Sequence, residues 1–163
     1  MKLKGKHIFI TGGAQRLGRA VSERLLQEEI VLSSTYRTSI DLSENLVAYG
    51  CTIGKSIFTV KMDLRDLSQI TSAVTLAVKK FGPVDILLNC ASDFYPTPVL
   101  EVSKNQWDAL QETNLRGQFF VAQACAKEML KKGGLIINFG DTNGEHPLKI
   151  GRASCRERVC QYV

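Results

Sequence analysis

Residues 11–18 read T-G-G-A-Q-R-L-G, a glycine-rich stretch that stands between a short apolar run and an amphipathic one. The apolar run, residues 7–11, is typical of a buried β-strand. After the glycines, Leu17, Val21 and Leu25 recur at intervals of four, which predicts one buried stripe along an α-helix. The stretch therefore predicts a strand, a glycine-rich loop and a helix in succession, which is the first unit of an α/β fold.

Such a loop is suited to bind an anion, because the backbone N–H groups of the helix start and the helix dipole point at the same place. Gly12 permits the tight turn after the strand, and Gly18 permits close packing of the helix on the strand. A Walker-type loop is excluded, since no Gly-Lys-Ser/Thr sequence ends the motif. The loop predicts a nucleotide site, and the alternative is an ordinary glycine-rich turn.

The rest of the chain repeats the alternation of short β-type runs with longer amphipathic runs. Ser103 is a candidate N-cap of a long helix, and Gly82-Pro83 and Gly133-Gly134 are candidate helix ends. The expected strands are residues 7–11, 30–36, 56–62, 84–89 and 135–139, and the later helices are residues 42–49, 67–81 and 103–132. Right-handed crossovers then predict a doubly wound parallel sheet of strand order 3-2-1-4-5, with ligand loops at the carboxyl ends of the first and fourth strands.

The composition is that of one soluble domain: 163 residues, 44% hydrophobic and 23% charged, which excludes disordered and collagen-like chains. Apolar runs of a few residues are too short for a bilayer or a signal peptide, so we expect a cytoplasmic protein without membrane association. The net charge of +5 includes no dense basic block, so nucleic acid is not an expected partner. Five cysteines without a C-x-x-C pair predict no metal site and reduced, mostly buried thiols.

These motifs resemble those of the short-chain dehydrogenase/reductase family, whose first loop reads T-G-x-x-x-G-x-G. Its pteridine-reductase-like branch has Arg in place of the middle glycine, as Arg16 is here, and its pattern N-N-A-S-x-F-Y-P-T-P is similar to N-C-A-S-D-F-Y-P-T-P at residues 89–98. The resemblance runs over residues 6–148 and includes Asp63-Leu64, Asn89-Cys90-Ala91-Ser92 and Asn114. It implies a Rossmann-like α/β fold that is incomplete at its C-terminal side, because the family's later helix and final strands are missing.

The end of the second strand indicates which dinucleotide the resemblance implies. Tyr36-Arg37-Thr38 lacks the acidic residue that accepts hydrogen bonds from the ribose hydroxyls of NAD. Arg37 offers charged donors to a 2′-phosphate, and Thr38 adds a hydroxyl. A charge-assisted bond of about 1.5–3 kcal/mol predicts a preference for NADP(H) of about 10- to 100-fold. A solvated surface charge is the alternative for Arg37. The cofactor-binding residues that we expect are Thr11, Gly12, Arg16, Leu17, Gly18, Tyr36, Arg37, Thr38, Asp63, Leu64, Asn89, Ala91 and Ser92.

Three further residues are candidates for chemistry or substrate binding. The resemblance implies that Phe94 stacks on a pterin ring, that Asn114 orients a water for proton relay, and that Asp141 takes part in proton delivery. Each has a structural alternative: Phe94 as a core aromatic, Asn114 as a buried amide and Asp141 as a turn residue. Asn89 has one too, as a strand cap.

The family's proton donor is the Tyr of a Tyr-x-x-x-Lys motif, and no such pair occurs in these 163 residues. Loss of a general acid alone lowers a rate about 10²- to 10⁴-fold, so we expect this chain to be inactive. Residues 150–159, I-G-R-A-S-C-R-E-R-V, match the translation of a common short-read sequencing adapter. We expect residues 1–149 to be the N-terminal portion of a reductase domain and residues 150–163 a non-native tail that packs poorly; a native basic helix is the alternative.

The resulting functional hypothesis is an NADPH-dependent oxidoreductase that transfers hydride to a pteridine-like C=N bond or to a carbonyl. The expected partner is a small-molecule substrate, a pterin or a carbonyl compound, and the parent protein is expected to be a homo-oligomer. Two alternatives stay open. One is a carbonyl or 3-ketoacyl reductase of the same family, and the other is a non-catalytic nucleotide-binding protein on the same fold.

Overall fold

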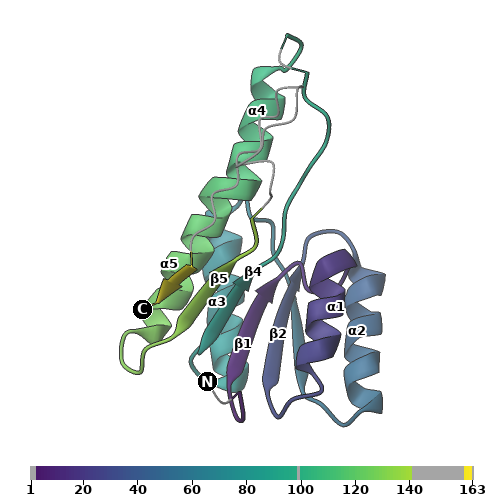
Figure 1. Cartoon of the computed structure of the whole chain (residues 1–163), viewed down its shortest axis with the longest axis vertical. Helices are drawn as coiled ribbons and strands as arrows, with labels where there is room; N and C mark the ends of the chain where they lie inside the picture. Colours follow the sequence, from purple (N-terminus) through teal and green to yellow (C-terminus); the bar gives the residue numbers. More distant parts are fainter. Residues whose placement is uncertain (1–2, 99, 141–159, 163) are drawn as a thin grey trace.

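A computed structural model describes residues 3–98, 100–140 and 160–162 of the chain. Its sheet has the strand order β3-β2-β1-β4-β5-β6 (Figure 1). The first five strands are parallel, which confirms the predicted order 3-2-1-4-5 and the α/β class. The strands are β1 His7–Thr11, β2 Val31–Tyr36, β3 Ile57–Lys61, β4 Ile86–Asn89, β5 Leu135–Asn138 and β6 Cys160–Tyr162. The helices are α1 Arg16–Leu25, α2 Ile40–Thr52, α3 Leu67–Phe81, α4 Lys104–Gln111, the π-helical segment η1 Glu112–Gly117 and α5 Gln118–Met129.

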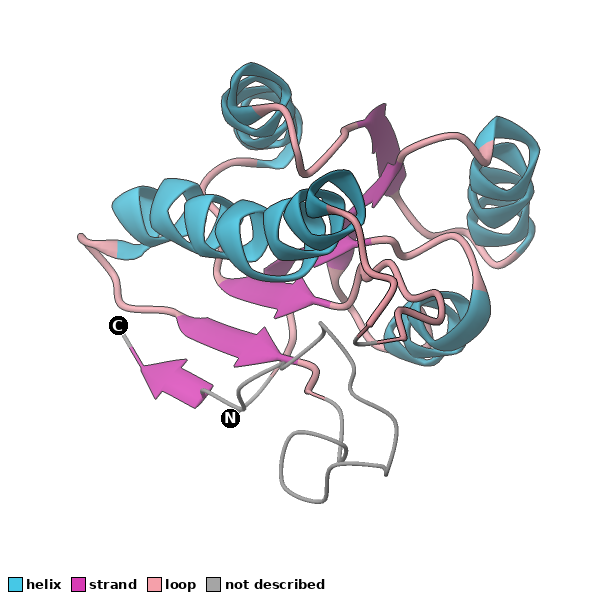
Figure 2. Ribbon diagram, turned by 90° about the horizontal axis from the view of Figure 1, so that it is seen from above, coloured by secondary structure: helices cyan, strands magenta, loops and turns pink. Residues whose placement is uncertain are grey.

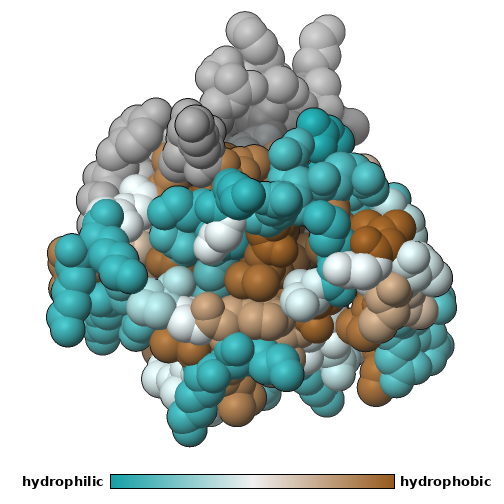
Figure 3. All heavy atoms as spheres, turned by 90° about the horizontal axis from the view of Figure 1, so that it is seen from below, coloured by the Kyte–Doolittle hydropathy of each residue, from teal (hydrophilic) through white to brown (hydrophobic). Residues whose placement is uncertain are grey.

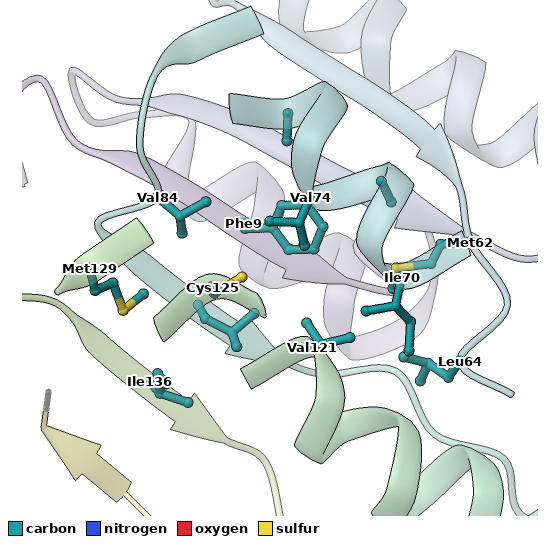
Figure 4. Close-up of a cluster of buried hydrophobic side chains, with 13 residues drawn as sticks. Phe9, Met62, Leu64, Ile70, Val74, Val84, Val121, Cys125, Met129 and Ile136 are labelled. Atoms are coloured by element: carbon teal, nitrogen blue, oxygen red, sulfur yellow. The ribbon is translucent and has the colours of Figure 1, made fainter. Parts of the chain in front are cut away.

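Helices cover both faces of the sheet, as the view from above shows (Figure 2). Successive side chains of a strand point to opposite faces, so the continuous apolar run of β1 supplies two cores. Phe9 belongs to the core on one face, where it lies beside Val74 of α3, and Cys125 of α5 and Ile136 of β5 extend the same cluster (Figure 4). Ile8 and Ile10 belong to the second core, beneath α1 and α2.

Capping residues mark the start of α4 and the end of α3. The Ser103 hydroxyl accepts a hydrogen bond from the N–H of Gln106, whose side chain bonds back to Ser103, so the predicted N-cap is confirmed as a capping box. Gly82 ends α3 at a φ of 83°. The single helix predicted over residues 103–132 is interrupted by η1, where a Cβ on Gly117 would lie 2.4 Å from the Leu64 carbonyl oxygen. This close approach to the loop after β3 is a tertiary feature that local periodicity does not report.

Two predictions about burial were wrong. Leu17 was expected on a buried stripe of α1 but is 55% exposed, because the first turn of that helix borders an open pocket. The buried positions of α1 are the small residues Gly18 and Ser22, which let the helix lie close to the sheet. The cysteines were expected to be mostly buried; Cys125 is, whereas Cys51 near the end of α2 is exposed.

The strand β6 was not predicted. It pairs antiparallel with β5, with Gln161 opposite Ile136, so the backbone of residues 160–162 continues the sheet beyond β5. The sequence analysis ended the sheet at the fifth strand and expected the tail to pack poorly. Most of that tail, and Asp141 with it, lies outside the described residues.

At the end of the sheet seen from below, hydrophilic side chains are interspersed with hydrophobic ones (Figure 3). The carboxyl ends of the parallel strands lie at the other end, where the short connection into α1 and the long connection into α4 leave the sheet (Figure 1). Within the described residues, none of the helices has the length and apolar character needed to cross a membrane.

His7 is a buried titratable group of the core, with 2% of its surface exposed. Its Nδ1 lies 2.8 Å from the Gly82 carbonyl oxygen and its Nε2 lies 2.8 Å from the Ser33 hydroxyl. A carbonyl oxygen only accepts, so Nδ1–H donates to it and the neutral Nε2 accepts from Ser33. Burial lowers the pKa of His7 below 6.5, although the carbonyls of Gly82 and Pro83 and the Asp85 charge act in the opposite direction.

Stability should therefore fall with pH on the acid side of neutrality. Above about pH 7.5 His7 is neutral in both states; as the pH drops through 6.5 the unfolded chain takes up a proton that the native core resists. Chemical denaturation from pH 8 to 5 should show a loss of at most about 1.4 kcal/mol per pH unit from this residue. His7→Gln should remove that component, whereas His146→Gln, at the other histidine of the chain, should keep it. A His7→Gln chain with the slope of the parent would contradict this assignment.

Candidate functional site

A pocket of about 280 Å³ opens at the carboxyl edge of the sheet. It lies where the chain connectivity reverses: β1 leads through α1 to β2 on one side, while β4 is the neighbour of β1 on the other. The loops after β1 and β4 diverge at such a point, which is where ligands bind in doubly wound sheets. Of the residues predicted to bind a cofactor, the pocket is lined by Gly12, Arg16, Leu17, Gly18, Tyr36, Arg37, Thr38, Asp63, Leu64, Ala91 and Ser92.

The glycine-rich loop is held against the β4 loop by close backbone packing. Gly12 has a φ of 66°, and a Cβ there would lie 3.0 Å from the Cα of Ala91. A Cβ on Gly18 would lie 2.1 Å from the Gly12 carbonyl oxygen, far inside any real contact. Thr11 lies beneath the pocket, where its hydroxyl accepts hydrogen bonds from the N–H groups of Cys90 and Ala91, each at 3.0 Å. The glycines thus create the space, and Thr11 fastens the two loops together.

Arg16 has a φ of 49°, the only positive φ at a non-glycine position in the described part of the chain. A side chain in this left-handed region costs about 1–2 kcal/mol relative to the right-handed one. The residue keeps the backbone conformation that glycine adopts readily, and it adds a guanidinium to the pocket lining at the start of α1. A cation at the N-terminus of a helix is unfavourable toward the helix dipole, so the local structure of α1 does not by itself favour an arginine at this position.

The end of β2 supplies a second cation. Tyr36, Arg37 and Thr38 line the pocket, and the Arg37 guanidinium forms an ion pair with Asp93, in which Nη1 lies 2.6 Å from Oδ2. Asp93 lies in the loop after β4, so the pair joins the two sides of the pocket. The sequence analysis did not identify Asp93, because nothing local links residues 56 positions apart.

Asp63 lies in the loop after β3, with Leu64 buried beside it. The Arg65 guanidinium donates hydrogen bonds to both carboxylate oxygens, the shortest from Nη2 at 2.6 Å. These bonds hold the pKa of Asp63 below its usual range, although partial burial acts in the opposite direction and the Arg37 charge adds a smaller lowering. The Asp63 carboxylate is therefore ionised and oriented by the residue two positions further on.

Asn89 and Asn114, both predicted to act on cofactor or protons, are buried and bonded within the protein. The Asn89 side chain donates to the Oδ1 of Asn138 at 2.8 Å, behind the pocket lining. Asn114, in η1, exchanges two hydrogen bonds with the backbone of Asp93: its Nδ2 lies 2.8 Å from the Asp93 oxygen and its Oδ1 lies 3.0 Å from the Asp93 nitrogen. The Asn89 side chain thus joins the end of β4 to β5, and the Asn114 side chain joins the loop after β4 to η1.

Phe94 lies outside the pocket lining and is 51% exposed, next to Asp93 in the same loop. Thr113 lines the pocket and was missed by the sequence analysis. Its hydroxyl is buried and has no hydrogen-bond partner among the described residues. The described residues contain no group of three or more His, Cys, Asp or Glu side chains placed to hold a metal ion.

A family model described as short chain dehydrogenase matches residues 6–153. The chain belongs to the short-chain dehydrogenase family. Among curated relatives, a sorbitol dehydrogenase from Cereibacter sphaeroides is 32% identical over 146 residues, an alignment that covers 88% of this chain and 56% of that protein. The chain thus spans about half the length of this curated relative of the short-chain dehydrogenase family.

Solved structures of short-chain dehydrogenases have the same fold. A short-chain dehydrogenase/reductase from Serratia marcescens superposes with a TM-score of 0.88 at 33% identity, covering 95% of this chain and 62% of that one. A short chain dehydrogenase from Burkholderia cenocepacia, solved in complex with NADP, superposes with a TM-score of 0.87 at 27% identity and covers 93% of this chain and 61% of that one.

Proposed function

We propose that the pocket at the switch point binds NADP(H), and that the chain is the cofactor-binding portion of an NADPH-dependent reductase. The observation that carries the proposal is that Arg37 and Thr38 line the same pocket as Arg16 and the glycine loop. Two cationic side chains and the predicted phosphate loop line one cavity. The similarity to the Burkholderia cenocepacia structure in complex with NADP supports the same choice.

The residues present fit this cofactor. A Cβ at Gly12 or Gly18 would collide with Ala91 or with the Gly12 carbonyl, so these glycines permit the tight loop whose backbone lines the pocket. The buried Thr113 hydroxyl, without a partner among the described residues, offers a hydrogen bond to a bound group. The donor set is suited to phosphates, with Arg16 at the helix start and Arg37 with Thr38 at the end of β2.

Bound NADPH would supply the hydride. The chain's own contribution in this proposal is to bind and to orient: Arg37 and Thr38 hold the 2′-phosphate, and the loop from Gly12 to Gly18 receives the pyrophosphate. Asn114 fixes the loop that carries Phe94 through its bonds to Asp93. Asp141, in this proposal a participant in proton delivery, lies outside the described residues.

For the substrate we propose a pterin, on the strength of the ten-residue similarity at residues 89–98. Phe94 is half exposed in the loop beside the pocket, a position from which its ring can stack on a flat heterocycle. The second candidate is a carbonyl substrate, which the similarity to a sorbitol dehydrogenase favours. We further propose that residues 1–149 form the reductase portion and that residues 150–163 are non-native, and that the encoding DNA contains an adapter sequence there.

Calorimetric titration of the 163-residue chain with NADPH and NADH tests the cofactor proposal. We expect NADPH to bind about 10- to 100-fold more tightly than NADH, because only NADPH carries the phosphate that Arg37 receives. Arg37→Ala should bring the two affinities within about threefold, mainly by weakening NADPH. Arg24→Ala, which removes an exposed arginine outside the pocket lining, is the matched control and should keep the preference. Equal binding of both nucleotides by the parent chain would overturn the assignment.

A further inference from the structure

The cation best placed for a 2′-phosphate already has an anionic partner inside the protein. The Arg37 Nη1 lies 2.6 Å from Oδ2 of Asp93, and Nη2 lies 3.5 Å from Oδ1. Arg37 follows β2 and Asp93 lies in the loop after β4, and both line the pocket. A ligand anion that binds Arg37 must therefore compete with the Asp93 carboxylate, which accepts hydrogen bonds from the same guanidinium N–H groups.

Asp93 is held in this position by the protein interior. The two hydrogen bonds from the Asn114 side chain engage only backbone atoms of Asp93, so they set the course of the loop and leave the carboxylate directed at Arg37. Asn114 is 8% exposed and belongs to η1, which directly follows α4 and leads into α5. The loop that carries the Asp93 carboxylate is thus held in place by η1.

Asp63, the other acidic residue of the pocket lining, is in a different situation. Its carboxylate oxygens accept bonds from Arg65, whose guanidinium neutralises it locally. Asp93 has no comparable partner other than Arg37 among the ion pairs of the described residues. When a dianionic phosphate takes over Arg37, the Asp93 carboxylate loses its hydrogen-bonded counter-ion, keeps only the charge of Arg65, which is already bonded to Asp63, and lies close to a like charge.

We infer that Asp93 competes with the 2′-phosphate for Arg37 and sets an upper limit on the affinity of the pocket for 2′-phosphorylated nucleotides. The inference rests on the proposed function, because it assumes that a 2′-phosphate reaches Arg37. It assigns to Asp93 a specificity-determining role: its charge lowers the preference for NADPH over NADH that Arg37 creates. A nucleotide without the 2′-phosphate leaves the ion pair intact, so its binding is insensitive to Asp93.

Asp93→Asn separates this role from a structural one. The substitution keeps the shape of the side chain and the backbone atoms that Asn114 holds, and it removes the charge. We expect NADPH to bind the full chain about three- to tenfold more tightly at low ionic strength, with a smaller gain in high salt, and NADH affinity to change less than twofold. Asp108→Asn is the matched control: it removes the same charge from a similarly exposed carboxylate that is ion-paired on α4, and both affinities should stay within twofold.

The possible results separate a failure of this inference from a failure of the proposed function. Weaker or unchanged NADPH binding in Asp93→Asn, or an equal gain for NADH, overturns the inference while the proposed function stands. Asp93→Ala repeats the test with a side chain that cannot bond to Arg37, and in an Arg37→Ala background the effect of Asp93→Asn should fall below twofold. If the folded parent chain binds neither nucleotide, the proposed function fails and the inference falls with it.

Discussion

Gly18→Ala should nearly abolish nucleotide binding by this chain. The new methyl group would lie 2.1 Å from the Gly12 carbonyl oxygen, and that obstacle is backbone, which cannot rotate away as a side chain can. The loop must therefore open, at a cost of about 3 kcal/mol, the upper part of the usual range for overpacking. Because the opened loop no longer presents its N–H groups together, NADPH affinity should fall about 100-fold or more in a calorimetric titration.

Gly54→Ala is the control for this experiment. Gly54, unlike Gly18, has a positive φ, 68°, but a Cβ there meets open space, and the residue lies in the turn between α2 and β3, outside the pocket lining. It should lose about 1 kcal/mol of stability through backbone strain and bind NADPH like the parent. If Gly18→Ala bound NADPH as tightly as Gly54→Ala, the glycine loop would not be the phosphate site.

The second large effect concerns turnover. We expect the 163-residue chain with NADPH to reduce 7,8-dihydrobiopterin at no detectable rate, because it has no Tyr-x-x-x-Lys pair and a general acid contributes about 10²- to 10⁴-fold. Replacing residues 150–163 by the continuation of a family member that carries the motif should restore NADPH oxidation in a spectrophotometric assay. Changing the introduced tyrosine to phenylalanine should abolish it again.

The same restored protein tests which substrate is reduced. Phe94→Ala should lower pterin turnover and leave NADPH affinity within about twofold, since Phe94 lies outside the cofactor pocket lining. If the restored protein reduces simple ketones, ignores pterins and is indifferent to Phe94→Ala, the pterin proposal is wrong and the carbonyl alternative takes its place. Membership of the short-chain dehydrogenase family is independent of that outcome.

The strand order could be predicted because parallel strands are buried on both faces and therefore carry few charged residues, although β2 includes the buried hydroxyl residues Ser33, Ser34 and Thr35. The first four such runs and the glycine loop between β1 and α1 are strong local signals, and the structure places Gly12, Arg16 and Arg37 around one pocket as that reading requires. Burial on α1 was predicted less well. Leu17 has the right periodicity for the core, but the pocket removes the neighbours that would cover it.

Long-range partners could not be predicted from local patterns. The ion pair of Arg37 with Asp93 and the bonds of Asn114 to the Asp93 backbone join residues 56 and 21 positions apart, which only the folded topology brings together. The strand β6 was missed for a similar reason, since three residues carry almost no periodicity and their pairing with β5 is a tertiary event. The functional roles of Asn89, Phe94 and Asp141 stay predictions.

A crystal structure of this chain with NADPH tests the central claim most directly. The account predicts electron density for the nucleotide in the pocket at the carboxyl edge of β1 and β4, with the 2′-phosphate within hydrogen-bonding distance of the Arg37 guanidinium and the Asp93 carboxylate displaced from it. A nucleotide bound elsewhere, or bound in the pocket with the Arg37–Asp93 pair intact and the 2′-phosphate directed to solvent, would contradict it.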